Sequence, residues 1–294
     1  MHLKIIKQLR PTRIRDTKMK TLFRLLSVIA IIAVVLTGCK KKSASDDSSS
    51  NSGGGTPSSS IPEGAINGLF SISENKQVYF SKGNLQYQGS TGKWRFAEKQ
   101  WNIMNSGWFE LFGWGTGDNP KNLSENNGDY PAFVEWGKHA ISNGGNVGNK
   151  WRTLKIEEWK YVFWLRETES NILFAKAVVN DVDGMILLPD NWKEDYYTLN
   201  YANTYDVSYD YNVISENDWT NILEAKGAVF LPAAGMRRGE TMWVGAAGNY
   251  WSSDYYDYDD AQAYSAYFSA FMVDTWHSIY RNYGFSVRFV CDAK

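Results

Sequence analysis

The chain opens with a hydrophobic pattern that differs from everything after it. A basic start at Met19–Arg24 is followed by about a dozen mostly apolar residues, Leu25–Leu36, and then by Thr37-Gly38-Cys39. A positively charged start, a short apolar run and small residues before a cut are the features of a secretory signal peptide. The run is shorter than the ~20 residues that a membrane-spanning helix needs. The pattern therefore predicts a signal peptide over residues 1–38, with Met19 as the true start.

The residues around Cys39 suggest how the exported chain is held. Leu36-Thr37-Gly38-Cys39 resembles the lipobox of bacterial lipoproteins, which implies that Cys39 is acylated and becomes the first mature residue. Residues 40–60 are mainly Lys, Ser and Gly, and Ser/Gly runs behave as flexible coil. We expect residues 39–61 to form a tether on an outer-membrane lipoprotein, facing the cell surface or the periplasm. The alternative is an uncleaved membrane anchor.

Beyond residue 61, short apolar runs and alternating apolar and polar residues predict many short strands. The predicted strands are Gly68–Ser73, Gln77–Phe80, Asn84–Tyr87, Trp94–Ala97, Val178–Val179, Met185–Pro189, Ala228–Pro232, Asn249–Ser253, Ala261–Val273 and Gly284–Val290. In the last of these, Phe285, Val287 and Phe289 alternate with Ser286 and Arg288, as one face of a strand requires.

Two segments carry the pattern of a helix. Thr153–Glu167 has Thr153 as a plausible N-cap and two glutamates in its first turns. Asp218–Lys226 is shorter and is closed by Gly227. Between the strands, residues 107–149 are rich in Gly and Asn but also hold six Trp and Phe residues, so we expect a packed loop. The fold class predicted for residues 62–294 is α+β, in a single domain.

Charge and aromatic content narrow the binding partners. Of 31 Lys and Arg, 11 precede Pro62, whereas only 3 of 32 Asp and Glu do. The region from Pro62 onward thus holds 20 basic and 29 acidic residues, a net charge of −9. Such a surface repels phosphate backbones, so we do not expect nucleic-acid binding. All 13 Trp lie in this region, and composition alone cannot separate core tryptophans from ligand-contacting ones.

Several segments together resemble one protein family. They are Trp151-Arg152-Thr153-Leu154, Gly184–Asp190, Gly227–Arg237, Gly248–Ser253 and Gly284–Val290. This series resembles the Fibrobacter succinogenes major paralogous domain, which is common in surface lipoproteins of gut anaerobes. The resemblance implies the fold shared by C-type lectin-like domains and the formylglycine-generating, sulfatase-modifying enzymes. It covers most of residues 68–290 and is more specific in the C-terminal half.

The resemblance implies neither of the family's best-known chemistries. The enzymes use paired cysteines, whereas this region holds only Cys291. Calcium-dependent lectins use Glu-Pro-Asn or Gln-Pro-Asp with Trp-Asn-Asp, and none of these tripeptides occurs here. Asp181-Val182-Asp183-Gly184 starts like a calcium loop, but Trp192 stands where the closing Glu is needed. We therefore expect no cofactor; calcium held by carboxylates is the alternative, although no motif supports it.

No catalytic constellation stands out either. After the N-terminal segment only His139 and His277 are present, without zinc-ligand spacing or a nucleophile motif. The glycine-rich stretches 113–117 and 144–148 lack the Lys-Ser/Thr ending of a phosphate loop. We predict no catalytic residues, no metal site and no enzymatic activity.

One cluster is a candidate for ligand binding. Asp254, Tyr255, Tyr256, Asp257, Tyr258, Asp259 and Asp260 follow a predicted strand. Tyrosine offers a flat apolar ring with a hydrogen-bonding tip, which suits sugars and protein surfaces. A solvated acidic loop with locally packed tyrosines is the alternative. Residues 195–211 have a similar composition, and we expect Trp243 to lie near both segments.

These patterns favour a lipid-anchored envelope protein that binds a glycan or a protein in adhesion, with the membrane engaged through the anchor. A structural or fimbrial envelope component is the first alternative. The second is an enzyme related to the formylglycine-generating fold with altered chemistry. A pair of carboxylates roughly 5–9 Å apart in a cleft would favour a glycosidase.

Overall fold

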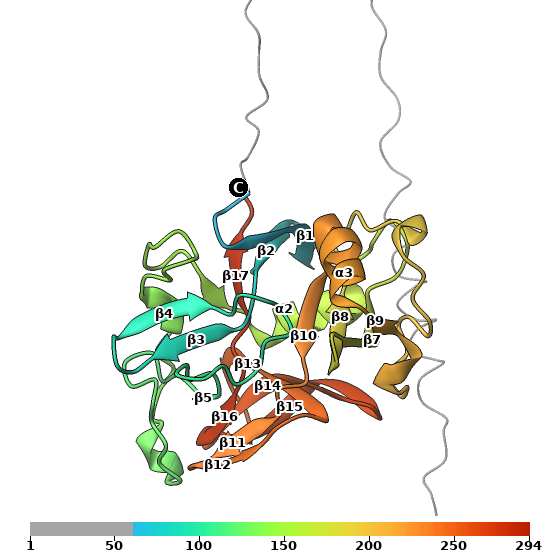
Figure 1. Cartoon of the computed structure of the whole chain (residues 1–294). Coiled ribbons are helices and arrows are strands. Elements are labelled where there is room, and N and C mark those ends of the chain that lie inside the picture. Colours follow the sequence, from blue (N-terminus) through green and yellow to red (C-terminus); the bar gives the residue numbers. More distant parts are fainter. Residues whose placement is uncertain (1–60) are drawn as a thin grey trace, which may run out of the picture. The chain divides into compact units, whose positions relative to one another are not determined.

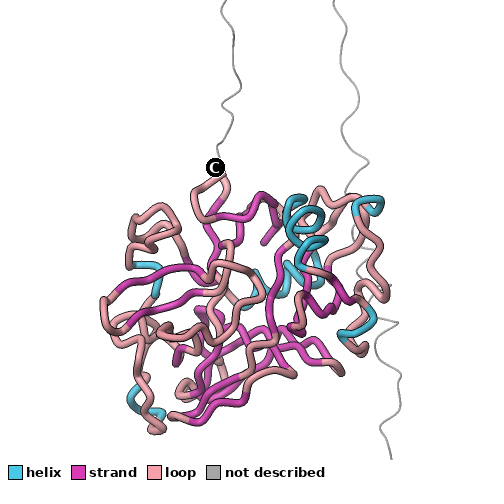
Figure 2. The backbone as a smooth tube through the Cα atoms, in the orientation of Figure 1, coloured by secondary structure: helices cyan, strands magenta, loops and turns pink. Residues whose placement is uncertain are grey.

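The computed structural model describes residues 61–294, and its backbone is built largely from short strands and long connecting loops (Figures 1 and 2). The signal peptide, Cys39 and nearly all of the tether lie outside the described residues, so those expectations stay predictions. Within the described part, mixed sheets with few helices confirm the α+β class. No helix in residues 61–294 is long and apolar enough to cross a membrane.

The described strands form three four-stranded sheets, one three-stranded sheet and one hairpin. The first sheet has the order β1 (Ala65–Ser73), β2 (Lys76–Ser81), β17 (Phe289–Asp292), β6 (Arg152–Thr153). The second has the order β10 (Val229–Pro232), β8 (Val182–Leu187), β7 (Phe174–Val179), β9 (Val213–Ile214). The third has the order β12 (Thr241–Trp243), β11 (Met236–Arg238), β16 (Tyr283–Phe285), β5 (Phe112–Gly113). The three-stranded sheet consists of β13 (Ala247–Tyr255), β14 (Gln262–Ser269) and β15 (Met272–Tyr280), and the hairpin of β3 (Leu85–Gln88) and β4 (Lys93–Phe96).

The helical segments are short. They are η1 (Asn127–Asp129), η2 (Trp136–Lys138), α2 (Ile156–Lys160), η3 (Tyr161–Leu165), η4 (Glu194–Tyr196), η5 (Tyr209–Tyr211), α3 (Glu216–Asp218), η6 (Trp219–Leu223) and η7 (Glu224–Lys226). The helix predicted to end at Gly227 is confirmed, since α3, η6 and η7 run without a break to that glycine. Gly227 adopts φ +89°, where the carbonyl of Asn67 lies 2.5 Å from the position of an added Cβ.

The four early strands are confirmed, and they form two hairpins. β1 pairs with β2 and β3 with β4, both antiparallel. The turn between β7 and β8 is tighter than predicted, because Asn180 and Asp181 both adopt positive φ and Asp183 already pairs with Val178. The apparent start of a calcium loop is thus a hairpin turn leading into a strand.

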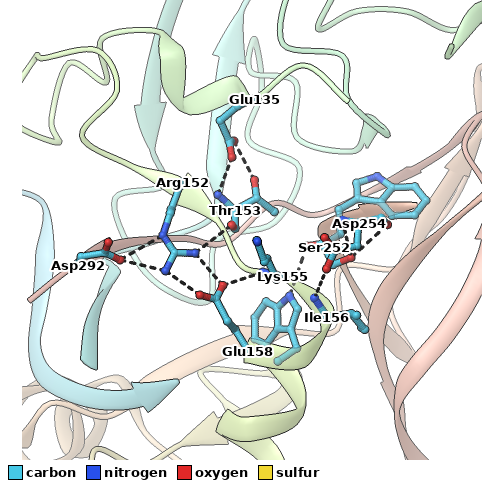
Figure 3. Close-up of polar contacts among 11 residues, drawn as sticks. Glu135, Arg152, Thr153, Lys155, Ile156, Glu158, Ser252, Asp254 and Asp292 are labelled. Atoms are coloured by element: carbon cyan, nitrogen blue, oxygen red, sulfur yellow. Dashed lines mark hydrogen bonds and ion pairs between the residues drawn. The ribbon is translucent and has the colours of Figure 1, made fainter. Parts of the chain in front are cut away.

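The main predicted helix begins later than expected. Thr153 is no N-cap, because it pairs with Phe289 in the sheet while its amide and hydroxyl both donate to Glu135. The α-helix starts at Ile156 and passes into a π-helical segment at Tyr161. Glu158 accepts from the amide of Lys155 at 2.8 Å and forms an ion pair with Arg152 (Figure 3). The side chain that accepts from the amide of Lys155 therefore comes from within the helix and not from Thr153.

Two C-terminal strand predictions are wrong in detail. The run 261–273 is two strands, β14 and the start of β15, because the chain turns at Ala270 and Phe271. The run 284–290 is broken between β16 and β17, and it is buried on both sides. Arg288 is 0% exposed, and its guanidinium donates to the carbonyl of Phe230 and to Gln100. Alternation therefore misleads here, since the polar partners face the interior as well.

The aromatic loop 107–149 is packed, as predicted. Trp114 and Trp136 in it are 2% and 0% exposed, and both belong to a core cluster with Trp251 and Phe289. Another core cluster centres on Trp159 and joins the first sheet to β8, β10, β13 and β14. A third lies around Trp192 and Trp219. Large aromatic rings thus fill each of these clusters.

Candidate functional site

Aromatic side chains gather where β13 ends and the chain returns along β14. β13 pairs with β14 and β14 with β15, and α2 contacts all three strands (Figure 1). A hydrogen bond closes the turn between β13 and β14: the amide of Tyr256 donates to the carbonyl of Gln262 at 3.0 Å. This turn contains most of the predicted cluster 254–260.

Four rings form a continuous row, which we call the tyrosine–tryptophan face: Tyr258, Tyr256, Tyr264 and Trp276. The ring centroids of Tyr258 and Tyr256 are 5.5 Å apart, and those of Tyr256 and Tyr264 are 5.2 Å apart. Tyr264 then meets Trp276 at 5.9 Å. The last two contacts are edge-to-face, which is a favourable geometry for aromatic pairs.

The row runs from the interior to solvent. Tyr264 is buried in the core cluster around Trp159, whereas Tyr258 is 85% exposed and Trp276 is 55% exposed. Tyr256 is half-buried and packs against the same core. A buried ring therefore anchors two exposed rings, one at each end of the row, and supplies a rigid base for contact with a ligand.

The helix α2 and its continuation η3 flank this face. The ammonium of Lys160 in α2 lies over the ring of Trp276, and it also pairs with Glu157. Trp164 in η3 donates from its indole N–H to the hydroxyl of Thr275 at 3.1 Å. Trp164 is itself 40% exposed, and Leu165 beside it is 62% exposed. The helix thus borders the face with one cation and more apolar surface.

The charge near the face is mainly negative. Asp257 is exposed and accepts a hydrogen bond from the Tyr264 hydroxyl at 3.4 Å. Burial, helped by the charge of Asp257, raises the pKa of Tyr264, so its hydroxyl stays protonated. Asp260 is exposed as well. Exposed carboxylates therefore border the face, whereas the Lys160 cation beside Trp276 is only 7% exposed.

Asp254, which the sequence suggested as a ligand-binding residue, has a structural role. Its carboxylate accepts from the amide of Ile156 at 2.7 Å (Figure 3). This amide is the first of α2, and a carboxylate at a helix N-terminus satisfies an otherwise unpaired donor. Asp254 therefore fixes α2 against β13 and is not free to contact a ligand through that oxygen.

Two other residues of the predicted cluster also lie apart from the face. Asp259 accepts from the amide of Ala261 and from Gln262, both at 2.9 Å, and these bonds lower its pKa. It shapes the turn. Tyr255, the last residue of β13, is 56% exposed, and its ring is not part of the ring pairs that form the row.

Trp243 lies at the far end of β13. In β12 it pairs with Met236 of β11, four residues before β13 begins, whereas the face lies where β13 ends. Eight steps of ~3.3 Å along β13 separate its ends by roughly 26 Å. The hydroxyl of Tyr209 reaches the carbonyl of Ala246 at 3.3 Å, so the end of segment 195–211 does approach Trp243. The structure thus brings Trp243 near one tyrosine segment and not the other.

Sequence reasoning missed Tyr264, Trp276 and Lys160. β15 was not predicted as a separate strand, so nothing placed Trp276 beside the tyrosine turn. The proximity depends on the strand register: Ser278 faces Tyr264 across the β14–β15 pair, and Trp276 lies two residues before Ser278. Residues on one side of such a pair are near neighbours.

Other chemical groups in the described chain have structural surroundings. No group of three or more His, Cys, Asp or Glu side chains in residues 61–294 is arranged to hold a metal. His139 stacks on Trp94 and bonds the carbonyl of Gly117. Cys291 is a free, buried thiol, and burial raises its pKa to about 11, which disfavours the reactive thiolate.

Comparison with known proteins gives no match: no family model, no curated protein and no solved structure is similar to this chain.

Proposed function

We propose that the tyrosine–tryptophan face binds a glycan. The observation that carries the proposal is the row of four touching rings, anchored by buried Tyr264 and exposed at Tyr258 and Trp276. Aromatic rings offer flat apolar surfaces to the C–H faces of sugar rings, and phenol hydroxyls supply hydrogen bonds at their edges. Rings held by their neighbours lose little conformational entropy when a ligand stacks on them.

The charge around the face favours a neutral sugar or an amino sugar over an acidic one. Asp257 and Asp260 accept hydrogen bonds from hydroxyl or ammonium groups, and they repel carboxylates and sulfates. Lys160 is already paired with Glu157, so it offsets little of this charge. We therefore assign the ligand to neutral or amino glycans.

The wider proposal is a lipid-anchored, non-enzymatic envelope protein with a C-type lectin-like fold that acts in adhesion. The lipobox-like Leu36–Cys39 supports the anchor, and the segments resembling the Fibrobacter succinogenes major paralogous domain support the fold. Binding to an envelope protein, a structural or fimbrial role, and an enzyme with altered chemistry stay predictions. No feature of the face favours one of them over glycan binding.

A glycan array with the labelled full-length protein tests this function. We expect binding to neutral or amino glycans above uronic and sulfated ones, and at least a tenfold loss in the double variant Tyr258→Ala/Trp276→Ala. The matched control is Trp243→Ala/Tyr205→Ala, which removes the same two ring types at positions 49% and 50% exposed. Equal binding by the two double variants, or no glycan bound by the parent protein, would contradict the proposal.

A further inference from the structure

The structure also contains a cavity that shares no residue with the tyrosine–tryptophan face. The cavity has a volume of about 380 Å³ and lies between the loop 104–111 and the β11–β12 hairpin. Ligand pockets in proteins run from roughly 300 to 1,000 Å³, so this one suits a small molecule. Its walls are mainly apolar, formed by Met104, Trp108, Phe109, Leu111, Leu123 and Met242.

One wall residue is a buried cation. Arg237 is 2% exposed, and its guanidinium donates to three backbone carbonyls, those of Leu111, Gly239 and Asn122. Within residues 61–294, no carboxylate oxygen lies within 4.0 Å of it, whereas the buried Arg166 pairs with Asp190. Carbonyl dipoles orient the guanidinium but do not neutralise it, and a buried charge without a counter-charge is costly.

The guanidinium also has donor capacity to spare. It carries five N–H groups. Three carbonyls and the hydroxyl of Tyr130 account for at most four of them among the described residues. An anionic group that entered the cavity could therefore accept a charge-assisted hydrogen bond and supply the missing counter-charge.

The acidic residues that line the cavity do not supply a counter-charge to Arg237. Glu110 is buried with its oxygens turned to Gln86 and to the amide of Met104, 3.0 Å away, and burial raises its pKa. Glu240 is exposed. A further guanidinium, that of Arg95, lies 3.8 Å from the ring centroid of Trp108. The fixed positive charge of Arg237 thus has no carboxylate partner at this cavity.

We propose that this cavity binds a small amphipathic carboxylate, with its apolar body against Trp108, Phe109 and Leu123 and its carboxylate toward Arg237. The inference does not depend on glycan binding, because it uses different residues. A medium-chain fatty acid or an arylalkanoic acid has this chemistry. An alcohol or amine of the same apolar body lacks the group that Arg237 requires.

Calorimetric titration of the full-length protein with octanoate, 1-octanol and octylamine tests the proposal. We expect one octanoate to bind per chain, and the alcohol and the amine to bind at least tenfold more weakly. Equal affinity for the three compounds, or no saturable octanoate binding, would overturn it.

Two variants locate the site. Arg237→Met should weaken octanoate binding at least tenfold, while Arg238→Met, the adjacent exposed arginine, should leave it within twofold. Leu123→Trp fills the cavity from a half-buried position and should abolish binding of all three compounds. If Arg237→Met fails to fold, as judged by circular dichroism, the Leu123→Trp variant decides whether octanoate binds in this cavity. Undiminished octanoate binding to folded Leu123→Trp, or an equal loss in the two arginine variants, would refute the assignment.

Discussion

Two populations of aromatic residues in this chain have opposite roles. Trp251 is fully buried and donates from its indole N–H to the carbonyl of Phe112 at 2.7 Å. Tyr258 and Trp276 are mostly exposed and contact other rings. Trp251 fills space and satisfies its polar atom inside the protein, whereas Tyr258 and Trp276 present their rings outward. Exposure separates the two roles, which composition cannot do.

The acidic residues of the same turn divide in the same way. Asp254 is bound to a helix amide, and Asp259 to its own turn. Within residues 61–294, Asp257 accepts one hydrogen bond, from the Tyr264 hydroxyl at 3.4 Å, and it stays open to solvent. Seven consecutive residues of similar chemistry therefore include structural members and solvent-exposed ones side by side.

The sharpest test of the comparison is to remove a core ring. Trp251→Ala should lower the free energy of unfolding by about 3–5 kcal/mol, because the cavity it leaves cannot be refilled by its neighbours. Chemical denaturation followed by circular dichroism measures this change. A loss below about 1 kcal/mol would mean that Trp251 does not belong to the packed population.

Removal of the helix cap should have an intermediate effect. Asp254→Ala should cost about 1 kcal/mol of unfolding free energy, since the first amide of α2 loses its acceptor. Asp260→Ala is the matched control, and we expect a change within about 0.5 kcal/mol because Asp260 is exposed. Equal costs for the two aspartates would remove the distinction drawn between them.

Removal of an exposed ring should barely change stability. Tyr258→Ala should shift the free energy of unfolding by no more than about 0.5 kcal/mol, because the residue is 85% exposed. Glycan binding should nonetheless fall severalfold in the same variant. A large loss of stability in thermal melts would place Tyr258 with the core rings.

The smallest effect expected is in the pH dependence of stability. Burial raises the pKa of Glu110 above 4.5, so its contribution to stability is present below that pH and is lost as the pH rises through the raised value. Hydrogen bonds lower the pKa of Asp259 below 3.8, so its contribution is present above that pH and is lost on acidification. The test is the difference in unfolding free energy between the parent protein and each variant, Glu110→Gln or Asp259→Asn, measured at several pH values. Plotted against pH, the two differences should have slopes of opposite sign. Slopes of the same sign would contradict the environment assigned to one of the two carboxylates.

Local signals predicted much of the fold. The β1–β2 and β3–β4 hairpins follow alternating apolar residues with turn residues between them, and the helix before Gly227 ends where a left-handed glycine permits it. The failures have tertiary causes. Thr153 resembles an N-cap, but Phe289 pairs with it in the sheet and the half-buried carboxylate of Glu135 accepts from its amide.

The candidate site was predictable only in part. The tyrosine turn 255–258 was visible as a run of residues, yet its partner Trp276 comes from a strand whose preceding turn, Ala270-Phe271, holds neither Gly nor Pro. Arg237 gave no signal at all, because the lack of a counter-charge depends on which distant carbonyls surround it. Pairing between remote segments decides both cases.

The most direct test of glycan binding is a crystal structure of the protein soaked with the oligosaccharide that the array ranks highest. The account predicts a sugar ring stacked on Tyr258 or Trp276, with a hydroxyl within hydrogen-bond distance of Asp257. A sugar bound elsewhere, for example beside Trp243 at the opposite end of β13, with the tyrosine–tryptophan face empty, would contradict it.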